Sequence, residues 1–177
     1  MSELPTTSSY SHILDKLAAE IRATGIFKPA ARIEPAPGPL SENWLQKNAL
    51  PHGGALPAIA GLAGVDVLTN GMKKHQLNMG LYFIPAPANR ARQASDLADD
   101  VSAIVNLIEG NRWGLAGTGK PDKLRASNRY SVNLDKQGTS LWTIDWTQTF
   151  YLEGHGQRAE RLGLVLDAEE RGQLTDA

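Results

Sequence analysis

Two stretches of the chain carry apolar residues at every third or fourth position, the spacing of one helix face. Ser8 or Ser9 can accept a hydrogen bond from an amide of the first turn of the earlier helix, and Gly25 favours its end. The apolar stripe of this helix is Ile13, Leu14, Leu17, Ala18 and Ile21. The later stripe predicts a second helix over residues 89–109, ended by Gly110, with Ala94, Leu97, Val101, Ile104, Val105 and Ile108.

Strict alternation of apolar and polar residues predicts strands elsewhere in the chain. Residues 75–84 alternate, and Asn70-Gly71 before them favours a tight turn from a strand in the second half of residues 58–69. A second hairpin turns at residues 135–138. Its first strand alternates Leu124, Ala126, Tyr130, Val132 and Leu134, and its return strand places Trp142, Ile144, Trp146, Phe150 and Leu152 on one face. Residues 26–34 predict a short edge strand, because Pro29 cannot donate to a ladder.

Residues 35–57 interrupt this regular pattern. They contain five prolines, at positions 35, 37, 39, 51 and 57, and three glycines, at 38, 53 and 54. Proline fixes φ and removes a donor, so this stretch predicts a long loop inserted into the domain. Trp44 and Leu45 lie in its middle. An aromatic side chain on such a loop is a candidate anchor on the parent domain or on a partner.

The pattern predicts an α+β fold with one mostly antiparallel sheet of four to five strands and two helices on one face. The order is helix, three strands, helix, two strands. A length of 177 residues fits a single domain, here residues 10–152, after a flexible N-terminus of residues 1–9. Residues 153–177 form a C-terminal extension with six acidic residues and three arginines.

Composition narrows the function classes. A net charge of −1 excludes a strongly basic nucleic-acid module. The chain has no cysteine, which excludes disulfide scaffolds, thiol catalysis and thiolate metal sites. No signal segment and no apolar run of about 20 residues is present, so we expect a soluble, intracellularly made protein with no membrane contact.

One segment resembles a phosphate-binding loop, from Gly114 to Lys120. The next residue is Pro121 where the magnesium-binding hydroxyl would stand, and a predicted helix precedes the segment where a strand is required. We therefore interpret it as a flexible glycine-rich connector. The four histidines are too far apart for a local ligand pair, and we expect no catalytic residue, cofactor or metal. Asp145 is predicted to pair with Arg125 or Arg129 across the hairpin.

The element order resembles the tail terminator proteins of tailed phages, in particular the Mu-like group. The resemblance covers roughly residues 11–152. The segments that carry it are SHILDKLAAEIRATG, LAGVDVL, GLYFIPAP, ASDLADDVSAIVNLIEGNRWG and YSVNLDKQGTSLWTIDWTQTFYL. Residues 35–57 and 153–177 depart from the family pattern as an insertion and an extension.

The resemblance implies a structural virion protein, assembled in the host cytoplasm, that acts at the head-proximal end of the tail. Six copies would form a ring that caps the tail tube, stops its polymerisation and joins it to a neck or head-completion protein. Genomic DNA would pass through the lumen without specific binding. The candidate assembly contacts are Trp44, Leu45, Arg125, Arg129 and Asp145. A head–tail connector or neck protein, a nucleotide-binding enzyme that uses residues 114–120, and a monomeric accessory module are the alternatives.

Overall fold

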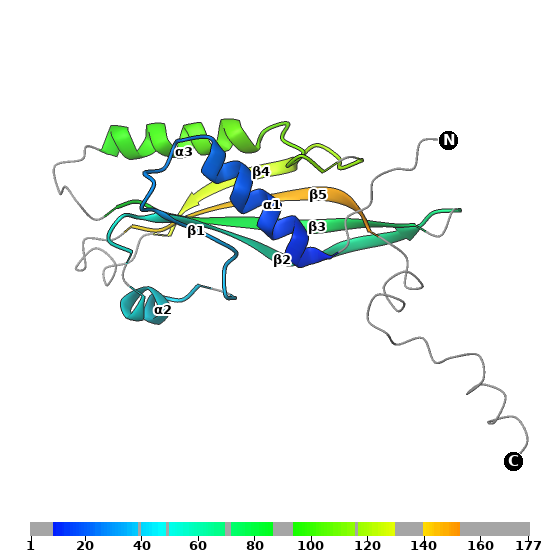
Figure 1. Cartoon of the computed structure of the whole chain (residues 1–177), viewed down its shortest axis with the longest axis horizontal. Coiled ribbons are helices and arrows are strands. Elements are labelled where there is room, and N and C mark those ends of the chain that lie inside the picture. Colours follow the sequence, from blue (N-terminus) through cyan, green and yellow to red (C-terminus); the bar gives the residue numbers. More distant parts are fainter. Residues whose placement is uncertain are drawn as a thin grey trace, which may run out of the picture.

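One five-stranded sheet organises the molecule (Figure 1). This computed structural model describes residues 9–38, 40–48, 50–69, 72–86, 94–115, 117–129 and 140–152. The strand order is β1-β2-β3-β5-β4. The strands are β1 Arg32–Ile33, β2 Gly54–Val67, β3 Lys73–Ile84, β4 Asp122–Asn128 and β5 Trp142–Leu152. Only β1 and β2 run parallel, so the predicted α+β fold with a mostly antiparallel sheet is confirmed.

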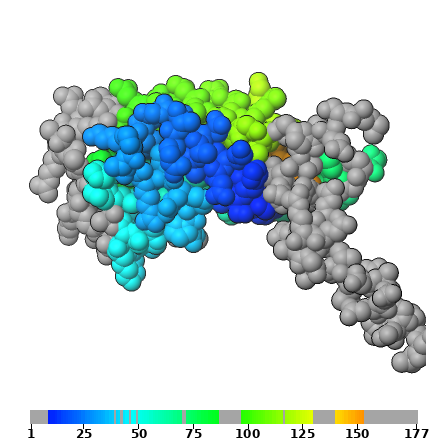
Figure 2. Space-filling view, in the orientation of Figure 1, coloured from blue at the N-terminus to red at the C-terminus, as the bar shows by residue number. Residues whose placement is uncertain are grey.

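Both predicted helices form, and they cover the same face of the sheet. Helix α1 spans Tyr10–Ala23, and the Ser9 side chain caps it by accepting a hydrogen bond from the His12 amide at 3.2 Å. Helix α3 spans Ala94–Ile108, and Gly110 follows with a φ of 78°. Residues 89–93 of the predicted helix lie outside the described residues. In Figure 2, α1 in dark blue lies at the front of the molecule and α3 in green lies along its top.

The covered face of the sheet holds the main core. The apolar residues of β3 and β5 that were predicted to share one face are buried there against both helices. They are Leu77, Met79, Leu81 and Phe83 of β3 with Ile144, Trp146, Phe150 and Leu152 of β5. The helices contribute Ile13, Leu17, Ala18, Ile21, Val101, Ile104 and Ile108. The face assignment made from alternation alone is confirmed for these two strands.

The prediction that residues 35–57 form a loop is wrong at two places. Residues 42–47 form a short helix, α2 Glu42–Lys47, and residues 54–57 are the start of β2. Pro57 fits in the strand because its carbonyl accepts the Ala36 amide at 2.8 Å. The nitrogen and carbonyl of a strand residue point to the same side, so the missing N–H faces the edge and not β3.

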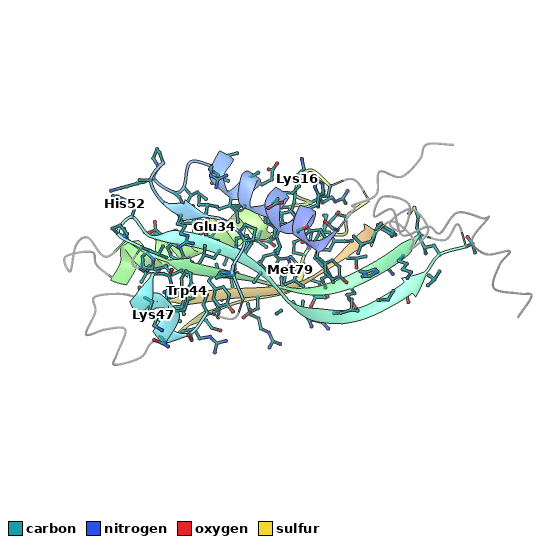
Figure 3. All side chains as sticks on the ribbon, turned by 60° about the horizontal axis from the view of Figure 1, so that its bottom comes forward. Lys16, Glu34, Trp44, Lys47, His52 and Met79 are labelled. Atoms are coloured by element: carbon teal, nitrogen blue, oxygen red, sulfur yellow. The ribbon has the colours of Figure 1, made fainter. Side chains whose placement is uncertain are left out.

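Helix α2 lies on the opposite face of the sheet, which we call the outer face. Its Leu45 packs in a second, smaller cluster with Leu56, Ile84 and Leu141. Figure 3 shows Trp44 and Lys47 on one side of the sheet and Lys16 of α1 on the other. The molecule therefore has a large core on the covered face and a small one at one end of the outer face.

The prediction of a half-buried first strand in the last hairpin is wrong for β4. All its described residues are exposed except Leu124, because β4 lies at the margin of the sheet and a bulge separates the pairs of Asp122 and Arg125 with β5. The predicted turns at residues 70–71 and 135–138, and residues 130–134, lie outside the described residues.

Replacing Trp146 by alanine tests the main core. Trp146 is 2% exposed, and we expect the substitution to lower the free energy of unfolding by about 3–5 kcal/mol, measured by urea denaturation. Trp44→Ala is the matched control, because the Trp44 side chain is only half-buried and its loss leaves a smaller cavity. Equal losses in the two variants would contradict the burial described here.

Candidate functional site

The outer face of the sheet brings the predicted contact residues to one side of the molecule. Trp44 and Leu45 lie on α2, and Arg125 and Asp145 lie opposite each other on β4 and β5. Arg129 follows β4, and its amide donates to the Leu141 carbonyl at 2.7 Å. Trp44 and Leu45 are 80 or more positions away from the other three residues in the sequence. Only the sheet topology therefore places the five on a common surface.

Trp44 and Leu45 anchor their segment on the parent domain. Ser41 caps α2 by accepting from the Trp44 amide at 3.1 Å. Leu45 is 7% exposed in the small cluster, and the Arg32 guanidinium lies 5.5 Å from the centre of the Trp44 ring. The Arg32 side chain also pairs with Glu34 at 2.5 Å. Trp44 was predicted to anchor either on its parent domain or on a partner, and the structure shows the contact with its own domain.

Asp145 lies at the centre of the exposed outer face. Arg125 is its direct neighbour in the strand register, and a Cβ on Gly80 of β3 would lie 3.4 Å from Asp145 Oδ1. The predicted pairing with Arg129 is wrong, because Arg129 Nε donates to Thr143 Oγ1 at 3.1 Å. Within the described residues, no ion pair closes between Asp145 and either arginine. Asp145 is thus an exposed carboxylate on the outer face.

A groove of about 790 Å³ runs around the edge of the sheet beside this residue, and we call it the edge groove. On the outer face it is lined by Leu40, Tyr82 and Asp145. It continues past Ala58–Ala60 of β2 to Tyr10 and Leu14 of α1. The groove can wrap around β2 because β1 pairs only with Gly54 and Ala55, which leaves the rest of that margin without a neighbouring strand.

A polar contact between α1 and β3 beside the edge groove was not predicted from the sequence. The Tyr10 hydroxyl and His75 Nδ1 are 2.7 Å apart, although 65 positions separate the two residues. Burial raises the pKa of Tyr10, and burial together with the charge of Lys73 lowers the pKa of His75. A neutral His75 therefore joins the start of α1 to β3. Spacing alone carries no signal for this pair, because it depends on how the helix crosses the sheet.

The glycine-rich connector is held by one buried side chain and is not the free loop that was predicted. Gln148 of β5 accepts from the indole nitrogens of Trp113 and Trp146 at 2.8 and 3.0 Å. Its amide nitrogen donates to the carbonyls of Asn111 and Gly119 at 2.9 and 2.8 Å. All four hydrogen-bonding positions are used, so Gln148 fixes both ends of the connector.

Several amides of the same connector are already used within the protein. The Gly119 amide donates to the Thr149 carbonyl at 2.9 Å, and the Leu115 amide donates to the Arg112 carbonyl at 2.9 Å. The segment also leads from α3 into β4, whereas a phosphate loop leads from a strand into a helix. Residues 114–120 have the composition of such a loop without its geometry.

A metal centre and a membrane-spanning helix are the other features to consider in the part of the chain that the structure describes. No group of three or more histidine or carboxylate side chains there is placed to hold a metal ion. None of the described helices has the length and apolar character needed to cross a membrane. The edge groove and the outer face around Asp145 are therefore the candidate site.

Replacing Gln148 by leucine tests the role of this residue in the connector. The substitution leaves two indole N–H groups and two carbonyls buried without partners, at about 1–3 kcal/mol for each unpaired group. We expect a clear loss of unfolding free energy and increased tryptophan fluorescence quenching by iodide. Gln76→Leu is the matched control, because Gln76 is exposed on β3. A Gln148→Leu variant as stable as the control would contradict the network.

Comparison with protein-family models and with curated proteins finds no match. The chemistry of the site therefore rests on the described residues alone. These residues form an open groove, a free strand margin and a mixed polar surface. Surfaces of this kind are suited to binding another macromolecule.

Proposed function

We propose that the chain is a structural protein of a phage tail, whose copies form a ring that caps the tail tube and joins it to the neck. The observation that carries this proposal is that, among the described residues, the sheet ends in two unlike margins with free edges. One margin is the edge groove at β2, and the other is the exposed strand β4 with Lys123 and Arg125. The resemblance in element order to tail terminators adds to it.

The directions of the marginal strands suit contacts between copies. Strands β2, β3, β5 and β4 alternate in direction, so β2 and β4 run opposite ways. Strand β4 of one copy would therefore lie antiparallel to β2 of the next, with the helices of both copies on one face. Contacts between unlike patches generate a ring when the rotation closes. Six copies, DNA passage without specific binding, and a tail tube partner follow from the proposed family.

Two alternatives differ in their partners. A neck or connector protein of the same design would bind the neck component and not the tube. A monomeric accessory module would use the edge groove for a ligand and would form no ring. The open groove alone is compatible with all three, whereas the pair of unlike margins favours self-assembly.

A mass measurement with a charge-reversal variant tests the ring. We expect light scattering across a concentration series, alone and with tail tube protein, to show a species near six times 19.1 kDa. Asp145→Lys should reduce this species, since it reverses a charge at the centre of the outer face. Asp99→Lys makes the same change on the exposed side of α3 and should not. A chain that stays monomeric in both settings would contradict the proposal and favour the accessory module.

A nucleotide-binding assay tests the remaining alternative of an enzyme. Because the connector leads from a helix into a strand, and the amides of Leu115, Thr118 and Gly119 already donate to carbonyls, we expect no heat of binding when ATP and magnesium are titrated into the protein. Binding by the parent chain that disappears in Lys120→Ala would overturn this expectation and restore residues 114–120 as a phosphate site.

A further inference from the structure

The far half of β2 is an edge strand with an apolar face. Beyond Ala60, β2 forms the edge of a three-stranded arm with β3 and β5. The register places Leu62 opposite Leu77 and Val65 opposite His75 on the covered side of the sheet. Leu62 is 51% exposed, Val65 is 42% exposed and Val67 is 69% exposed. An exposed apolar strand at the edge of a sheet is a hazard that folded proteins normally cover.

The chain supplies a segment that matches this arm. Residues 160–167 read Glu-Arg-Leu-Gly-Leu-Val-Leu-Asp, with leucines at alternate positions 162, 164 and 166. Alternation over this length is typical of a strand with one apolar face. The bulge between Leu62 and Gly64 places Leu62 and Val65 on the same face of β2, and ordinary alternation adds Val67, so the three residues lie on successive positions of one face.

The place where β5 ends brings this segment within reach. Leu152 is the last residue of β5, and it lies opposite Lys73, which pairs with Val67 near the end of the arm. A position beyond β2 is three strand spacings away from β5, about 14 Å. Residues 153–161 can span up to roughly 30 Å, which is ample. A segment that starts at the end of the arm and runs back along it is antiparallel to β2.

Charge favours the same contact. Residues 153–177 carry three arginines and six acidic residues, a net charge of −3. Among the described residues of the arm, Lys73 and Lys74 outnumber Asp66, and Lys74 pairs with Asp66 at 3.4 Å. The extension and the arm are thus opposite in sign.

We propose that residues 160–167 of the chain add to the free edge of its own β2 as a sixth strand and cover Leu62, Val65 and Val67. In this arrangement Leu162, Leu164 and Leu166 pack opposite Val67, Val65 and Leu62. Apolar pairs directly opposite each other across antiparallel strands are the unit that stabilises a sheet. The added strand covers the arm and leaves the edge groove at Ala58–Ala60 open. This inference does not depend on the proposed ring.

Cysteine cross-linking tests the contact on a clean background, because the chain has no cysteine. Val65→Cys is combined in turn with Leu162→Cys, Leu164→Cys and Leu166→Cys, and each full-length variant is oxidised under native conditions. A disulfide needs the two Cβ atoms within about 4.5 Å of each other. Val65→Cys with Leu174→Cys is the matched control, since Leu174 lies outside the segment that matches the arm.

We expect at least one of the three pairs to form a disulfide within one chain about tenfold faster than the control, because a docked segment has a high effective concentration. An intramolecular bond leaves the chain mass unchanged on a non-reducing gel. Three results would overturn the proposal: no bond in any pair, equal rates in the control, or a bond between two chains. The last result would assign the arm to a second copy.

Discussion

The two faces of the sheet are covered to different extents by helices, and this one constraint determines which surfaces the molecule exposes. Helices α1 and α3 both pack on the same face, where the side chains of β3 and β5 form the main core. In the described part of the chain, the outer face is covered at one end by α2 and the segment before it. A sheet covered in this way leaves a polar face around Asp145 and, among the described strands, two free margins. The edge groove, the exposed β4 and the apolar arm are all consequences of that cover.

A single polar side chain ties this sheet to the connector between α3 and β4. Gln148 points into the main core, where an unpaired amide would be costly, and it is stabilised because four partners surround it. The contact holds Trp113 against Trp146, whose ring centres lie 6.1 Å apart. It also explains why the glycine-rich connector follows a fixed path, because the Gln148 amide donates to the carbonyls of Asn111 and Gly119. Shape at this point comes from the buried network and not from the connector's own sequence.

The sequence predicted those parts of the fold that depend on local periodicity. The helix stripes and the alternation of β3 and β5 report burial directly, so the covered face was predicted residue by residue. Pro57 was misread because a proline that faces a free margin looks the same in sequence as one that ends a strand. The exposure of β4, the contact of Tyr10 with His75 and the role of Gln148 all depend on pairing over long separations, for which spacing carries no signal. Among the contact residues, the placement of Arg125 opposite Asp145 was predicted from the hairpin and is confirmed by the register.

We propose that the outer face and the two unlike margins are surfaces for assembly, while the face covered by α1 and α3 is not. Hydrogen exchange of the backbone amides, compared between dilute protein and protein at high concentration with tail tube protein present, tests this most directly. We predict slower exchange in β4 and in β2 near Ala58–Ala60, with α1 and α3 unchanged. Protection that appears on α1 and α3, or no change in either margin, would contradict the claim.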